Sequence, residues 1–94
     1  MTNRQSAPPP DENLILAVEE QVLAYLNARP ASADTLEGIH RWWIRWPGLE
    51  EPMTITEAAL IRLQARGLLE PCRVGTRILW RGLVPGRSNP ANTG

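Results

Sequence analysis

The stretch that most constrains the fold of this chain runs from Thr54 to Arg81 and reads TITEAALIRLQARGLLEPCRVGTRILWR. Thr54 and Glu57 form a capping-box pattern, which predicts that a helix begins here. Gly67 is well placed to end that helix in the left-handed conformation. Gly75 then occupies the first central position of a two-residue turn between two short strands. The stretch therefore predicts a helix followed by a β-hairpin.

A first helix is expected near the start of the chain. Apolar residues recur at helical spacing over residues 12–28, with Asp11 as the expected cap and Glu19 on the side away from the core. Pro30 ends this helix, because the residue before a proline is disfavoured in helical geometry. Residues 12–28 are therefore expected to form an amphipathic helix of the core.

A second helix is expected in the segment ASADTLEGIHRWWIRW. Asp34 and Glu37 form a capping-box pattern at its start, and Ser32 is a competing cap. A glycine inside a helix costs about 1 kcal/mol relative to alanine. Gly38 is therefore expected to allow the close approach of a ring or a backbone.

The tryptophans of this segment divide between the core and the surface. Trp42 lies about 100° around the helix from Trp43, so the two rings cannot share one pocket. Trp43 is expected in the core, on one face with Leu36, Ile39 and Trp46. Trp42 either covers the edge of the core or belongs to an exposed binding patch.

The length and the order of these elements define the expected fold class. With 94 residues, the chain has room for one small domain with a single modest core. The expected class is α+β and mostly α, with three helices and a C-terminal two-stranded hairpin. The expected domain covers residues 12–83, between disordered tails at 1–11 and 84–94, which are rich in proline or polar residues and lack periodicity.

The chain resembles the winged helix-turn-helix superfamily, roughly over residues 13–83. The specific part of the resemblance is the run Ala59-Leu60, Leu63 and Arg66-Gly67-Leu68-Leu69, followed by the hairpin at Gly75. The earlier segment Asp34-Thr35-Leu36-Glu37-Gly38-Ile39 with Trp42-Trp43 also looks like a pattern of small bacterial proteins, to which no activity attaches.

The resemblance implies a three-helix winged helix-turn-helix domain that binds duplex DNA and regulates transcription. In that arrangement the third helix approaches the major groove and the hairpin, or wing, contacts phosphates. The nucleic-acid-binding residues that follow from it are Thr56, Arg62, Arg66, Arg73, Arg77 and Arg81.

The charge distribution and the third helix favour an alternative, a protein-interaction adaptor that does not bind nucleic acid. The net charge is zero, although residues 1–52 carry 4 Arg against 8 acids and residues 53–94 carry 6 Arg against 2. The outward positions of the third helix hold few side chains able to read a base edge. The partner is then another protein or a second copy of the chain, and the expected contact residues are Trp42, Glu50, Glu51, Ala58 and Ile61.

The remaining chemistry is sparse, and an enzyme is not expected. His40 is the single histidine and is expected at the surface or boundary, while the lone Cys72 is expected to be a partly buried structural thiol. No spacing of metal ligands and no glycine-rich phosphate loop occurs, so no metal and no cofactor are expected. No apolar run reaches the roughly 20 residues that span a bilayer. Without a signal peptide, a cytoplasmic protein with no membrane partner is expected.

Overall fold

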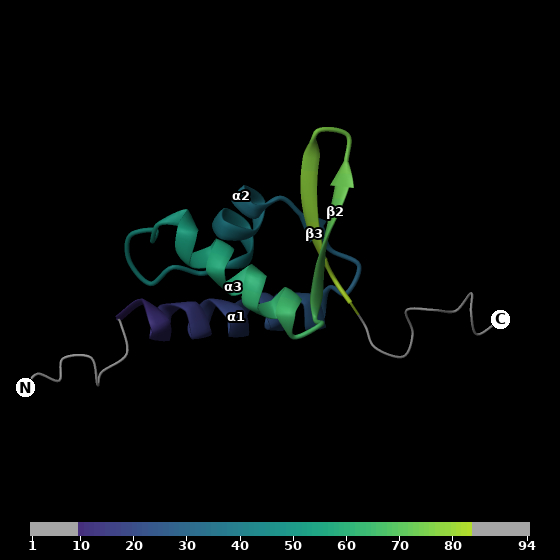
Figure 1. The fold of residues 1–94 in the computed structure, drawn as a ribbon. Helices are drawn as coiled ribbons and strands as arrows, with labels where there is room; N and C mark the ends of the chain where they lie inside the picture. The colour runs from purple at the N-terminus through teal and green to yellow at the C-terminus, as the bar shows by residue number, and fades with distance from the viewer. Residues whose placement is uncertain (1–9, 84–94) are drawn as a thin grey trace, which may run out of the picture.

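The computed structural model describes residues 10–83 and shows an α+β fold (Figure 1). Apart from Pro10 and Asp11, the tails expected to be disordered lie outside the described residues. Within the described range, three helices and a π-helical turn pack beside a three-stranded antiparallel sheet. The elements are α1 (Pro10–Ala28), β1 (Ala33–Asp34), α2 (Leu36–Gly38), η2 (Ile39–Trp43), α3 (Met53–Ala65), β2 (Leu69–Val74) and β3 (Arg77–Gly82).

The first helix begins earlier than its sequence pattern indicates. α1 starts at Pro10, so Asp11 lies in its first turn. The expectation that Asp11 caps this helix is therefore wrong. A proline is well tolerated at the start of a helix because its missing N–H has no intrahelical partner there. Acidic residues in this first turn, Asp11 and Glu12, also face the positive end of the helix dipole.

The second helix is much shorter than predicted. Thr35, and neither Asp34 nor Ser32, is its N-cap, and the Thr35 hydroxyl accepts a hydrogen bond of 3.1 Å from the backbone N–H of Gly38. Asp34 instead accepts a bond of 2.8 Å from the backbone N–H of Thr35. A Cβ on Gly38 would overlap the carboxylate of Asp34, so this glycine does allow a close approach, by a side chain. After Gly38 the backbone widens into η2 and turns extended at Ile44.

The third helix lacks the capping box that its sequence predicts. α3 begins at Met53 with Pro52 as the N-cap, and no side chain caps it. The predicted capping box of Thr54 and Glu57 is therefore wrong. The helix begins before Thr54 because the fixed backbone angle of Pro52 leads the chain directly into it. The predicted stop is confirmed, because Gly67 has a left-handed φ of 78°.

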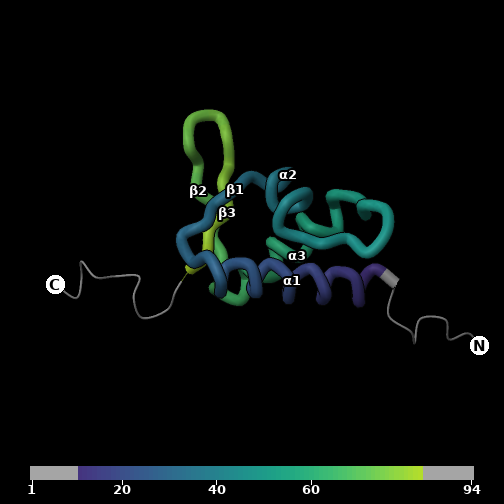
Figure 2. The backbone as a smooth tube through the Cα atoms, turned by 180° about the vertical axis from the view of Figure 1, so that it is seen from behind, coloured from purple at the N-terminus to yellow at the C-terminus, as the bar shows by residue number. Residues whose placement is uncertain are grey.

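The sheet has the order β1-β3-β2, and its strands are antiparallel. Val74 pairs with Arg77 across the two-residue turn, and Gly75 has a φ of 66°, so the predicted hairpin is confirmed. β1 was not predicted, because a strand of two residues carries no periodic pattern. Figure 2 shows it beside β3, and the hairpin extends beyond its end.

The core lies between α1, α3 and η2, with the base of the hairpin closing one end. Tyr25 of α1 stacks on Trp43 of η2 with ring centroids 4.3 Å apart and planes inclined by 11°. This stack fixes the π-helical turn against α1 and confirms the predicted core position of Trp43. The other buried apolar side chains are Val18, Val22, Leu26, Ile39, Ile44, Ile55, Ala59, Leu60, Leu63 and Leu69.

Candidate functional site

The outward side of α3 and the hairpin was the expected contact surface, and its arginines are the natural starting point. Arg62 does not point away from the domain. Its guanidinium donates to both carboxylate oxygens of Glu12 on α1, at 2.8 and 2.7 Å. This hydrogen bonding holds the pKa of Arg62 above its ordinary value and holds the pKa of Glu12 below 4.5. The pair joins α3 to α1, which lie side by side in Figures 1 and 2.

Arg66 is held by the same helix. It donates a bond of 2.8 Å to one oxygen of Glu19, and Arg62 lies 3.6 Å from the other oxygen. Glu19 is only 4% exposed, so its expected place on the outer side of α1 is wrong. A buried carboxylate is costly unless cations pair with it. Arg62 of α3 and Arg66 at its C-cap supply that pairing, and this explains why they turn toward α1.

The remaining arginines belong to the hairpin. Arg81 pairs with Glu70, its cross-strand neighbour, at 2.7 Å, and the hydrogen bond raises the pKa of Arg81 above its ordinary value. Arg73 and Arg77 are exposed, and neither forms an ion pair with any residue of the described range. They lie on opposite strands near the turn, as the sequence predicts.

Thr56, the last of the proposed nucleic-acid residues, lies in the interior. It is completely buried, and its hydroxyl lies 2.7 Å from Nδ1 of His40. Nε2 of the same ring lies 2.9 Å from a carboxylate oxygen of Glu50, and the His40 ring packs against Trp46 at 5.0 Å between centroids. His40 is 2% exposed, so the expectation of a surface or boundary histidine is wrong.

This cluster has the order of a carboxylate, an imidazole and a hydroxyl, as in nucleophilic hydrolases. The Thr56 hydroxyl has no solvent access, so a substrate cannot reach it in this structure. With His40 neutral, Nε2–H donates to Glu50 and Nδ1 accepts from the hydroxyl. Trp46 donates its indole N–H to the carbonyl oxygen of His40 at 2.9 Å. The cluster therefore fixes the segment between η2 and α3 on the domain.

The residues expected to contact a protein are spread over two regions. Trp42 is 76% exposed, which decides between its two predicted positions in favour of the surface. Ile61 is 53% exposed on α3, one turn after the half-buried Ala58. Glu50 is exposed but bonded to His40, while Glu51 is half-buried. Trp42 and Ile61 are thus the members of this set that present apolar surface to solvent.

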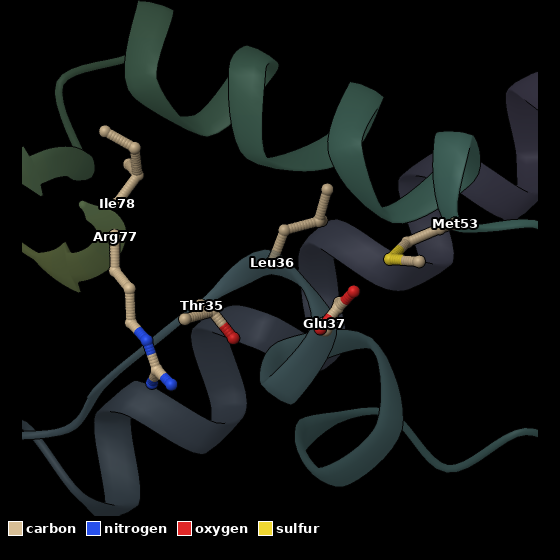
Figure 3. A pocket seen from close by; sticks show the side chains of 6 residues that line it. All are labelled: Thr35, Leu36, Glu37, Met53, Arg77 and Ile78. Carbon is tan, nitrogen blue, oxygen red and sulfur yellow. The ribbon is translucent and has the colours of Figure 1, made fainter.

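An open groove, which the sequence did not indicate, separates the hairpin from the N-terminal ends of α2 and α3. Its volume is about 530 Å³, within the range of ligand-binding clefts. The floor carries apolar side chains, and a guanidinium and a carboxylate stand on opposite sides (Figure 3). The lining residues are Thr35, Leu36, Glu37, Met53, Arg77 and Ile78.

Residues 10–83 contain neither a cluster of metal ligands nor a membrane-spanning helix. No group of three or more potential ligands among them could hold a metal ion. None of the helices in that range has the length and apolarity to cross a membrane. Cys72 is partly buried and unpaired, as expected.

Comparison of the chain with protein-family models, with curated proteins and with solved structures gave no match.

Proposed function

We propose that this chain is a winged-helix domain that acts as a protein-interaction module. The order helix, strand, helix, helix and hairpin supports the fold assignment, as does the sheet order β1-β3-β2. The adjacent positions of α3 and the projecting hairpin also match the expected helix and wing (Figure 1).

The observation that carries the functional proposal is the pairing of the α3 arginines with α1. A helix that reads DNA needs donors for base edges and cations for phosphates. Arg62 and Arg66 instead neutralise Glu12 and Glu19. The exposed positions of α3 that remain are mostly uncharged and include Ile61, with acidic Glu57 near the helix start. Such a face is suited to packing against a protein, and its carboxylate repels phosphate.

Trp42 provides a second apolar contact, on η2 and in a different region from Ile61. A large aromatic side chain that is 76% exposed contributes little to the core. Tryptophan is enriched among the residues that dominate binding energy at protein interfaces. Its exposure therefore supports a partner that covers η2.

A competing function, weak binding to duplex DNA, is favoured by Arg73 and Arg77. Both are exposed on the hairpin and have no ion-pair partner within the described residues. Two neutralised phosphates would give low affinity that falls as salt rises, with a slope of about −2 in log K against log salt. Charge reversal at both positions should abolish this binding and leave the fold intact, as fluorescence anisotropy and circular dichroism would show.

Affinity capture with matched variants tests the proposed function. The wild-type chain is used as bait in extract from cells that encode it, beside Ile61→Glu, Trp42→Ala and Gln64→Glu as an exposed control on α3. A partner that is recovered by the wild type and the control but lost with Ile61→Glu or Trp42→Ala supports the proposal. Sedimentation of the same four proteins shows whether that partner is a second copy of the chain. Equal recovery and equal sedimentation for all four contradict it.

A further inference from the structure

One edge of β3 is fully paired with a neighbouring strand, and the other edge is paired over only part of its length. On one side it pairs with β2 over its whole length, from Arg77 to Gly82. On the other side β1 pairs only with Trp80 and Arg81, because the chain leaves the sheet after Asp34 to begin α2. The part of β3 nearest the turn therefore has no strand beside it on the β1 side, within the described residues.

The register shows which backbone groups face this open edge. In a two-residue hairpin the closing residues, here Val74 and Arg77, form the hydrogen-bonded pair. Backbone groups of successive strand residues point to opposite edges, so Ile78 directs its N–H and C=O toward the β1 side. Pro71 agrees with this register, since it lies opposite Trp80 at a position where its missing N–H costs no bond to β3.

The groove described above lies directly beside this open edge. Its lining includes Arg77 and Ile78 of β3 and also Thr35 and Leu36, which follow β1. Leu36 and Met53 are half-buried and Ile78 is 41% exposed, so the floor offers apolar surface to an entering side chain. Methionine is flexible and adapts to side chains of different shape.

The charges at the groove are opposite and unpaired with each other. Arg77 and Glu37 both line it, yet they form no ion pair (Figure 3). Both side chains are exposed. An occupant with a carboxylate on the Arg77 side and a cation on the Glu37 side would complement both. Duplex DNA, which carries negative charge alone, would not.

We infer that the groove binds an extended peptide segment of a partner protein, added to β3 in line with β1. The peptide backbone pairs with the N–H and C=O of Ile78, as in other cases of strand addition. An apolar side chain of the peptide lies on Leu36, Met53 and Ile78, between an acidic residue near Arg77 and a basic residue near Glu37. This inference rests on the proposed function as a protein-interaction module, and it places the partner at a different surface from Trp42 and Ile61.

Selection from a random peptide library displayed on phage, with the full chain immobilised, provides the probe. We expect the enriched peptides to share an apolar residue between an acidic and a basic one. A synthetic peptide of that sequence, labelled with a fluorophore, is then titrated by anisotropy. Ile78→Glu and Arg77→Glu should weaken its binding by about tenfold or more, a loss of 1.4 kcal/mol for each factor of ten.

Arg73→Glu and Val74→Glu are matched controls, because both residues are exposed on the same hairpin and neither lines the groove. They should leave the affinity within about twofold of the wild type. The double variant Glu37→Arg with Arg77→Glu should prefer the peptide with its two charges exchanged. Amide hydrogen exchange gives a separate readout, since the bound peptide should slow exchange at Ile78.

Three results would overturn the inference. Enriched peptides whose binding depends on Ile61 or Trp42, and is unaffected by Ile78→Glu, leave the proposed function standing and remove the groove from it. Failure to enrich any peptide that depends on the groove residues also removes it. Unchanged exchange at the Ile78 amide in a saturated complex excludes strand addition. The proposed function itself is tested separately, by the capture and sedimentation results given above and by titration with duplex DNA.

Discussion

Arg62 of α3 donates two hydrogen bonds to Glu12 of α1, across 50 positions of sequence. This pair turns the best base-reading side chain of α3 toward the neighbouring helix. Arg66 is turned the same way by Glu19. The face that α3 presents to solvent therefore lacks unpaired arginines, and the exposed Ile61 is its largest apolar side chain.

The Glu12–Arg62 pair predicts a pH-dependent difference in stability. The pKa of Glu12 is lowered in the folded chain, chiefly by its hydrogen bond to Arg62, from an ordinary value of 4.5. The pair therefore stabilises the fold above pH 4.5, and its contribution is lost as pH falls through the lowered pKa. Urea unfolding of the wild type and Glu12→Gln should differ at pH 7 and converge in acid. A difference that grows below pH 4.5 would contradict this assignment.

Gly38 and Asp34 predict a strong coupling between two substitutions. Gly38→Ala alone should destabilise the fold by about 1–3 kcal/mol, because the new Cβ displaces the Asp34 carboxylate from the N–H of Thr35. In an Asp34→Ala background the overlap is absent, and alanine gains up to about 1 kcal/mol of helix propensity. Gly38→Ala should then be neutral or stabilising. A double-mutant cycle by urea unfolding measures this, and additive effects would refute it.

Truncation of the two adjacent tryptophans should have very different effects on stability. Trp43 is 5% exposed and stacks on Tyr25, so Trp43→Ala should cost about 3–5 kcal/mol in unfolding free energy. Trp42 is 76% exposed, and Trp42→Ala should change stability by no more than about 0.5 kcal/mol. Chemical denaturation of the two variants checks the pair. A large loss with Trp42→Ala would show that its ring supports the core and is not reserved for a partner.

The buried histidine cluster predicts an asymmetry between its two ends. Thr56→Val removes the hydroxyl from a fully buried position and leaves Nδ1 of His40 without a partner, at a cost of about 1–3 kcal/mol. Glu50 is 49% exposed at its side chain, so water can replace it when Glu50→Gln or Glu50→Ala is made. The Glu50 variants should therefore lose less stability than Thr56→Val. The reverse order would show that the Glu50–His40 hydrogen bond contributes more to stability than the Thr56–His40 one.

The hairpin and the end of α3 could be predicted because their determinants are local. Gly67 and Gly75 each adopt the left-handed conformation that a helix stop and a tight turn require. A close approach at Gly38 could also be predicted from the cost of a glycine within a helix, although the neighbour is the Asp34 carboxylate and not the expected ring or backbone. These signals depend on a few neighbouring residues, so a single sequence is sufficient to detect them.

The features that changed the functional interpretation join distant parts of the chain. The sequence gives no reason for Glu19 to be buried until α3 supplies Arg66, 47 positions later. His40 similarly becomes a core residue only because Thr56 and Glu50 reach its ring from beyond η2. β1 is too short to carry a periodic pattern. Because β1 could not be predicted, neither could the open edge of β3 beside it. The groove therefore could not be predicted from the sequence.

Titration of labelled duplex DNA with the wild-type chain, followed by anisotropy at moderate salt, tests the central claim most directly. The proposed protein-interaction function predicts no saturable binding, because Arg62 and Arg66 are paired with α1. Of the arginines expected to contact nucleic acid, Arg73 and Arg77 alone have no ion pair among the described residues. Any binding at low salt should be unaffected by Arg62→Ala. Saturable binding at moderate salt that Arg62→Ala abolishes would contradict the claim and identify α3 as a DNA-reading helix.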